Sequence, residues 1–320
     1  MLKKRRLILM LLLMVSINSW SQNKDYTFKV IPLGVKGGDD ESNLSCYMLA
    51  PNGSNNFICL DAGTINAGIQ KAIDRKTLKG ISEDIQRKQI KGYLISHAHL
   101  DHVAGLIINS PADTAKNIYG ISSVLNILRD KYFTWDAWAN FGNEGEKPQL
   151  KKYTYTILEE GLTYPLVDTE MKVRTFELSH GKPYKSTAFL IQANDNYILY
   201  LGDTGADEIE KSDKLFKLWQ EVAPLINAGK LKAILMEVSF PNEQPENQLF
   251  GHLTPHLFFN ELAKLQKVTS LEAMKKVSFI VTHQKPPLKS MIKIKEQLMM
   301  HNTAGFKLIF PDQGKLLTIY

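Results

Sequence analysis

Histidine and aspartate gather in one short stretch of this 320-residue sequence. His97, His99, Asp101 and His102 lie within six positions, directly after the apolar run 92–96. Side chains two residues apart at the end of a strand share a face, so His97 and His99 can converge on one ion. Imidazole nitrogens with a carboxylate oxygen suit Zn²⁺, with Mn²⁺ or Fe as alternatives. Solvated surface histidines are the other explanation, which the adjoining buried strand disfavours.

Three more residues of ligand type follow apolar runs later in the chain. They are His180 after residues 173–178, Asp203 after 197–201 and His283 after 277–282. Each could be structural on its own, but the repeated pattern indicates that all three meet the histidine cluster. Because a carboxylate can bridge two ions, the sequence predicts a two-metal site. We expect one ion on His97, His99, His180 and Asp203, and the other on Asp101, His102, His283 and Asp203.

The elements that must position these residues are short strands and helices. Strands are expected at residues 28–33, 44–50, 57–60, 92–96, 171–178, 187–193, 197–201, 233–238 and 277–282. Helices are expected at residues 69–79, 81–88, 120–131, 255–267 and 290–301. No linker or shift in composition marks a boundary. Residues 22–320 are therefore expected to form a single α/β domain of sheets covered by helices.

These motifs resemble those of the metallo-β-lactamase-fold hydrolases, in which H-x-H-x-D-H is completed by three later ligands. The run 97–111, HAHLDHVAGLIINSP, is similar to the signature of class II cyclic-nucleotide phosphodiesterases, as are residues 237–240, 251–255 and 282–286 to other blocks of that family. The resemblance extends from about Lys29 to the C-terminus, and no ligand is missing. It implies a four-layer αβ/βα sandwich, the metallo-β-lactamase fold, with metals at one edge. It also implies hydrolysis of cAMP or cGMP at the P–O3′ bond, giving a nucleoside 5′-monophosphate.

The chemistry of such a site follows from the two ions. Cations about 3.5–4 Å apart can share a hydroxide and polarise a phosphoryl oxygen. Zn²⁺ lowers the pKa of bound water from about 15.7 to about 7, so a metal-bound hydroxide is expected to attack phosphorus at neutral pH. Asp101 would also orient that hydroxide.

The departing 3′ oxygen needs a proton, and His252 is our candidate donor. It precedes Thr254-Pro255, which is typical of an N-cap followed by proline at the first helical position. The N-terminus of that helix would also favour phosphate. A histidine that only organises the loop is the alternative.

Four further residues are candidates for supporting roles. Asp61 and Glu237 each end a strand-like run and could hydrogen-bond a metal-bound imidazole, with capping as the alternative for Asp61. Lys285 could offset phosphate charge or lie in solvent. Trp138, in the aromatic stretch 134–142, could stack on the base or form a lid, as similar segments do in the phosphodiesterase family; buried packing is the alternative.

Two other functions compete with cyclic-nucleotide hydrolysis. The same fold could carry a β-lactamase, a lactonase or another phosphodiester hydrolase. A non-catalytic metal- or nucleotide-binding protein is the third hypothesis, which the complete ligand set disfavours.

The charge of the chain outside its N-terminus is nearly balanced. Lys3–Arg6 supply four of the 39 basic side chains, so the rest of the chain carries 35 basic against 33 acidic side chains. That balance gives no electrostatic case for a nucleic-acid partner or a membrane surface. The sequence does not indicate an oligomeric state.

The N-terminus has the pattern of a secretory signal peptide. Lys3–Arg6 precede the apolar run 7–15, and small or polar residues follow as far as Ser21. We expect cleavage after Ser21, which gives a periplasmic or secreted protein without stable membrane insertion. An uncleaved N-terminal anchor is the alternative.

Export would allow the two cysteines to oxidise. Cys46 and Cys59 flank Asn52-Gly53, a strong signal for a two-residue hairpin turn that would set the cysteines opposite each other. Directly opposed strand positions are often poor disulfide geometry. We therefore favour two free thiols in the core over a disulfide.

Overall fold

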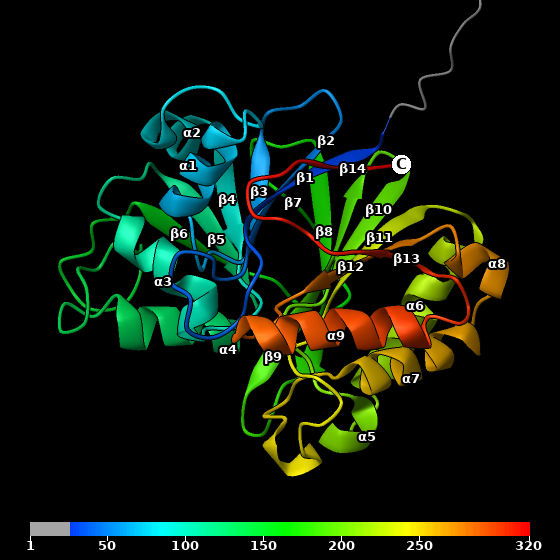
Figure 1. Ribbon diagram of the computed structural model, residues 1–320. Helices are drawn as coiled ribbons and strands as arrows, with labels where there is room; N and C mark the ends of the chain where they lie inside the picture. The colour runs from blue at the N-terminus through cyan, green and yellow to red at the C-terminus, as the bar shows by residue number, and fades with distance from the viewer. Residues whose placement is uncertain (1–25) are drawn as a thin grey trace, which may run out of the picture.

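The computed structural model describes residues 26–320, and the predicted signal peptide, residues 1–21, lies outside them. Two seven-stranded sheets pack face to face (Figure 1). The first sheet has the order β14-β1-β2-β3-β4-β5-β6. Its strands are β1 (Phe28–Gly34), β2 (Cys46–Pro51), β3 (Phe57–Leu60), β4 (Ile90–Leu94), β5 (Lys116–Gly120), β6 (Tyr153–Ile157) and β14 (Leu317–Ile319).

The second sheet has the order β13-β12-β11-β10-β9-β8-β7. Its strands are β7 (Thr163–Pro165), β8 (Met171–Ser179), β9 (Lys185–Ala193), β10 (Asn196–Tyr200), β11 (Leu231–Glu237), β12 (Ser278–Thr282) and β13 (Lys307–Ile309). Strands β10, β11 and β12 run parallel. Strand β8 has the same direction, because β9 lies antiparallel to both β8 and β10.

Helices cover the outer face of each sheet (Figure 1). Those beside the first sheet are α1 (Asn66–Asp74), α2 (Ser82–Lys88), α3 (Leu100–Asn109) and α4 (Ser122–Ile127), which continues as a π-helix at Leu128–Tyr132. Those beside the second sheet are α5 (Asp207–Glu210), α6 (Lys214–Asn227), α7 (Pro255–Gln266), α8 (Leu271–Met274) and α9 (Leu288–His301), with a 3₁₀ turn at Glu246–Gln248. The predicted four-layer sandwich is confirmed.

Three hydrophobic clusters separate these layers. Strand β11 shows how one strand serves two of them, because alternate side chains point to opposite faces. Ala233 and Leu235 pack between the two sheets, whereas Ile234 and Met236 pack with the outer helices. A strand that is buried on both faces has a continuous run of apolar residues in the sequence, which is why a strand such as β11 could be predicted.

Two expectations about local structure are wrong. Helix α1 ends at Asp74 rather than near residue 79, and Lys76 just beyond it has a positive φ of 61°. The connection between β2 and β3 is longer than a two-residue turn, and Cys59 pairs with Met48 instead of Cys46. Both cysteines are buried free thiols, as favoured from the sequence.

No helix within residues 26–320 has the length and apolar character needed to cross a bilayer.

Candidate metal centre

The seven predicted ligands come from the ends of four strands and the start of one helix. His97 lies just beyond β4, His180 directly follows β8, and Asp203 and His283 follow β10 and β12. His99 is the N-cap residue of α3, and Asp101 and His102 lie in its first turn. Since β8, β10 and β12 share one direction, their carboxyl ends meet at the same edge of the second sheet. The fold thereby brings residues from across the chain to one place.

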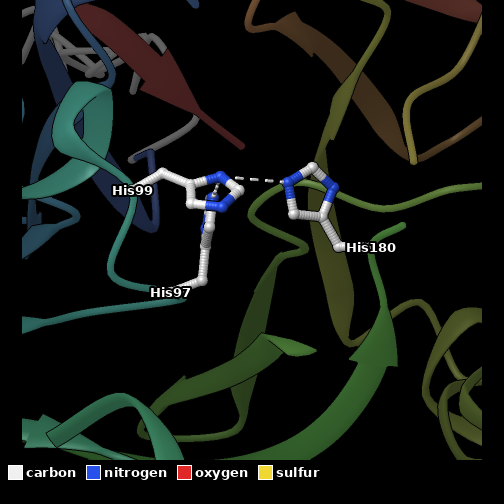
Figure 2. A group of neighbouring side chains, drawn as sticks. All are labelled: His97, His99 and His180. Atoms are coloured by element: carbon white, nitrogen blue, oxygen red, sulfur yellow. Dashed lines mark hydrogen bonds between the residues drawn. The ribbon is translucent and has the colours of Figure 1, made fainter. Parts of the chain in front are cut away.

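Three histidines form the first group. The Nδ1 atom of His99 lies 3.0 Å from Nε2 of His97 and 3.4 Å from Nε2 of His180. Figure 2 shows these rings turned so that their nitrogens face one another. Ligand atoms of the three residues all lie within 4.8 Å of one another, which is the spacing of donors around one ion.

The second group joins two histidines to two carboxylates. Nε2 of His283 lies 3.1 Å from Asp101 Oδ2 and 3.2 Å from Asp203 Oδ2. Nε2 of His102 lies 3.2 Å from the same oxygen of Asp203. That oxygen is also 3.7 Å from His97 Nε2 and 3.8 Å from His180 Nε2. Asp203 therefore stands between the two groups.

Burial and charge prepare these side chains for cations. Burial lowers the pKa of His97 well below its usual value and that of His180 to about 4, so both imidazoles are neutral at pH 7. Burial also acts to lower the pKa of His102, but the carboxylates of Asp203, Asp61 and Asp101 outweigh it and raise that pKa. These three carboxylates concentrate negative charge that a cation would neutralise.

Two buried atoms point to a missing partner. Within residues 26–320, Asp203 Oδ1 has no hydrogen-bond partner, and His102 Nε2 makes no hydrogen bond of proper geometry despite lying 3.2 Å from Asp203 Oδ2. Leaving a buried polar atom unsatisfied is costly, and native structures rarely do so. An imidazole nitrogen and a carboxylate oxygen are common ligands of divalent metals. The cluster therefore fits a metal centre.

Acceptors around the cluster hold the imidazoles in one orientation. Asp61 is fully buried, and its Oδ2 lies 2.7 Å from His102 Nδ1. The backbone oxygen of Gly251 lies 2.9 Å from His180 Nδ1. Each Nδ1–H donates to its acceptor, so Nε2 is the ring nitrogen that each imidazole directs into the cluster. Asp61 also accepts hydrogen bonds from the backbone N–H and the hydroxyl of Ser96, both at 2.7 Å.

Glu237 and Ser239 form a second supporting network. Glu237 Oε1 lies 2.8 Å from His252 Nδ1, and Glu237 Oε2 accepts a hydrogen bond from the hydroxyl of Ser239. The oxygen of Ser239 then accepts from Nδ1–H of His283 at 2.9 Å. Lys285 Nζ lies 2.9 Å from His252 Nε2. The carboxylate, both imidazoles and the ammonium group thus form one chain of contacts.

Helix α7 begins as expected beside this network. Thr254 is its N-cap and accepts a hydrogen bond from the backbone N–H of Leu257, and Pro255 occupies the first helical position. His252 lies two residues before the cap and is almost fully buried.

Trp138 lies away from the cluster. Its indole Nε1 donates to Ser110 Oγ at 3.1 Å, just beyond the C-terminal end of α3, whereas His99 is at the other end of that helix. A ten-residue helix is about 15 Å long, which places Trp138 outside the cleft at these histidines and does not support the expected stacking or lid role. The cleft beside His97 and His99 is lined instead by Tyr132 and Tyr184.

The close approach of residues 37–38 to two of the predicted ligands, Asp101 and His283, was not predicted from the sequence. The backbone N–H of Gly38 donates to Asp101 Oδ2 at 2.9 Å. A Cβ added at Gly37 would lie 2.1 Å from the His283 ring, so only glycine fits there. The adjacent glycines were a weak signal, because their contacts are with residues more than 60 positions away.

Comparison with known proteins identifies the family. The family model for class II cAMP phosphodiesterases matches residues 25–314. A 3′,5′-cyclic-nucleotide phosphodiesterase of Aliivibrio fischeri is 40% identical over 306 residues, covering 91% of this chain and 92% of that protein. The chain belongs to the class II cAMP phosphodiesterase family. A probable 3′,5′-cyclic-nucleotide phosphodiesterase of Yersinia pestis is 33% identical, covering 94% of this family member and 92% of the relative.

Solved structures agree with this class II family member in fold. Unliganded yeast PDE1 superposes with a TM-score of 0.79 at 23% identity, covering 92% of this chain and 99% of that one. The metallo-β-lactamase fold protein YhfI of Bacillus subtilis gives a TM-score of 0.59 at 14% identity, covering 91% and 99%. The predicted family and fold are both confirmed.

Proposed function

We propose that the protein is a binuclear metal-dependent phosphodiesterase that hydrolyses 3′,5′-cyclic nucleotides to nucleoside 5′-monophosphates. The observation that carries the proposal is the position of Asp203, one oxygen of which lies within 3.8 Å of imidazoles from both ligand groups. A carboxylate shared in this way could bridge two ions, and a pair of ions can stabilise both the attacking and the leaving oxygen in phosphodiester hydrolysis. Membership of the class II family and the names of its relatives support this substrate.

Seven residues would hold the two ions. The first ion would be bound by His97, His99, His180 and Asp203, and the second by Asp101, His102, His283 and Asp203. Nitrogen and oxygen donors in these proportions favour Zn²⁺. When bound, the ions would supply Lewis-acid polarisation of the phosphoryl group and a water of lowered pKa as nucleophile.

The remaining groups act on the substrate and its leaving oxygen. Asp101, at the less buried side of the cluster, would accept a hydrogen bond from the attacking water and orient it. His252 would donate a proton to the departing 3′ oxygen, while Glu237 holds its Nδ1–H and fixes the ring. Lys285 Nζ, next to His252 Nε2, would place positive charge beside the phosphate.

One assay tests the proposal against its rivals. Purified mature protein with Zn²⁺ is incubated separately with cAMP, cGMP, a cephalosporin and an acyl lactone. We expect turnover of a cyclic nucleotide to its 5′-monophosphate, because in-line attack opens the P–O3′ bond. A chelator should abolish that activity, and added Zn²⁺ should restore it. Hydrolysis of only the lactam or lactone would replace the proposal with another hydrolase, and inertness towards all four would leave a binding protein.

We propose further that residues 1–21 are a signal peptide and that residues 22–320 act in the periplasm or outside the cell. The basic start, apolar run and small-residue exit support this. Expression of the full chain in a Gram-negative host, followed by fractionation and N-terminal sequencing, tests it. We expect periplasmic protein beginning at Gln22. Full-length protein in the cytoplasm would contradict the assignment.

A further inference from the structure

An open cleft of about 500 Å³ adjoins the first ligand group. It lies between the start of β9 and α4 with its π-helical extension, and six of its lining residues matter here: His97, His99, Val124, Ile127, Tyr132 and Tyr184. A volume of this size suits a small organic ligand. Two of the apolar side chains that line it are partly exposed to solvent: Tyr184 is 55% exposed and Ile127 is 40% exposed.

Tyr184 is tied to the ligand group on two sides. It closes a four-residue turn that begins just after His180, in which the Tyr184 N–H donates to the backbone oxygen of Gly181 at 3.0 Å. Its ring meets the imidazole of His99 edge-on, with centroids 4.7 Å apart and planes at 75°. An exposed aromatic ring is thus held beside the candidate metal centre by contacts that do not need its solvent-facing surface.

The polar groups of the cleft are largely engaged with the protein. The hydroxyl of Tyr132 donates to the backbone oxygen of Ala98 at 3.0 Å. Lys185 Nζ lies 2.8 Å from Glu177 Oε2. The surface that remains exposed in the cleft is therefore mainly aromatic ring and aliphatic side chain. Such a surface binds a flat aromatic molecule by stacking, without hydrogen bonds to the polar groups at its edge.

We propose that this cleft binds the nucleobase of the substrate, with Tyr184 as the ring on which the base stacks and with Val124 and Ile127 opposite. The inference rests on the proposed function, which sets the phosphate on the ions beside His97 and His99. Tyr184 positions the substrate and takes no part in bond breaking. Because stacking is tolerant of base identity, adenine and guanine nucleotides depend on Tyr184 to the same degree.

Calorimetric titration of the zinc-loaded protein with AMP and, separately, with ribose 5-phosphate tests the subsite. Tyr184→Ala is expected to weaken AMP binding about 10-fold, the effect of losing one base–aromatic stack, and ribose 5-phosphate binding less than twofold. Tyr184→Phe keeps the ring and is expected to match the wild type. Trp138→Ala, an exposed aromatic outside the cleft, is the matched control and should leave both affinities unchanged. The KM for cAMP and for cGMP should each rise about 10-fold in Tyr184→Ala, with kcat within threefold.

Two results would overturn the subsite: equal losses for AMP and ribose 5-phosphate in Tyr184→Ala, or no loss for either. A wild-type protein that binds AMP through Tyr184 but hydrolyses no cyclic nucleotide would refute the proposed function and retain the subsite. Conversely, turnover of cAMP with an unchanged KM in Tyr184→Ala would retain the function and refute the subsite.

Discussion

Replacing Asp203 with alanine is expected to abolish hydrolysis and to reduce bound metal from two ions to one or none. Asp203 Oδ2 is the atom that contacts imidazoles of both ligand groups, so each ion site loses a ligand. Loss of an outer hydrogen-bond partner alone costs about 10- to 100-fold, so removal of a shared ligand should lower kcat/KM by more than about 10³-fold. Elemental analysis of the purified protein measures the metal.

The melting temperature gives a readout that does not depend on activity. A ligand that binds only the folded protein stabilises it in proportion to the logarithm of its concentration over Kd. Zn²⁺ should therefore raise the melting temperature of the wild type and have much less effect on Asp203→Ala. Asp195→Ala is the matched control, because Asp195 is an exposed aspartate that lies 3.7 Å from Lys230 and far outside the ligand groups. Full metal content in Asp203→Ala would refute the bridging role.

The layers of this fold were predictable because its central strands are buried on both faces. Runs such as 233–238 are apolar without interruption, and each ligand-type residue marks the point where such a run ends. Residues far apart in the chain could therefore be assigned to one edge from their order and spacing alone. That assignment did not need the register of the strands, but it did need the strands that end in a ligand to run in one direction, as β8, β10 and β12 do.

The two longest helices that escaped prediction, α3 and α6, did so for different reasons. In α3, the buried residues Val103, Leu106 and Ile107 have helical spacing, but Asp101 and His102 occupy the first turn and interrupt the apolar pattern there. Helix α6 carries buried residues at 215, 218, 219 and 222, also with helical spacing, but Pro224 lies within it. In both cases the periodic signal was present and a competing feature obscured it.

Three features of the structure depend on the tertiary fold and could not be predicted from the local sequence. Asn52-Gly53 does form a β-turn, in which the Ser54 N–H donates to the Pro51 carbonyl oxygen at 3.2 Å, but residues 54–56 lengthen the connection, so the expected two-residue hairpin is absent. Ser239 carries the contact between Glu237 and His283, yet nothing about a serine in the sequence marks such a role. Trp138 and Tyr184 are both exposed aromatics, and only their positions in the fold separate them.

Replacing His252 with glutamine is expected to lower kcat for cAMP by about 10²- to 10⁴-fold while leaving both metal ions bound. Its Nδ1 lies 2.8 Å from Glu237, which fixes the ring at the edge of the ligand groups. Its Nε2 accepts from Lys285 Nζ at 2.9 Å in this structure, and it is this nitrogen that would carry the proton to the 3′ oxygen. The 3′ oxygen of a ribose is a poor leaving group and needs that proton. His256→Ala is the matched control, because His256 is an exposed histidine in the first turn of α7.

The size of the loss should depend on the leaving group. A 4-nitrophenyl ester of thymidine 5′-phosphate releases a phenolate of low pKa, which departs without a proton, so His252→Gln should hydrolyse it at nearly the wild-type rate. A merely structural histidine would slow both substrates equally, since a disordered loop impairs any substrate. Loss of metal in His252→Gln would make His252 a ligand instead of a donor. The ratio of the two rates therefore separates proton donation by His252 from support of the loop that carries it.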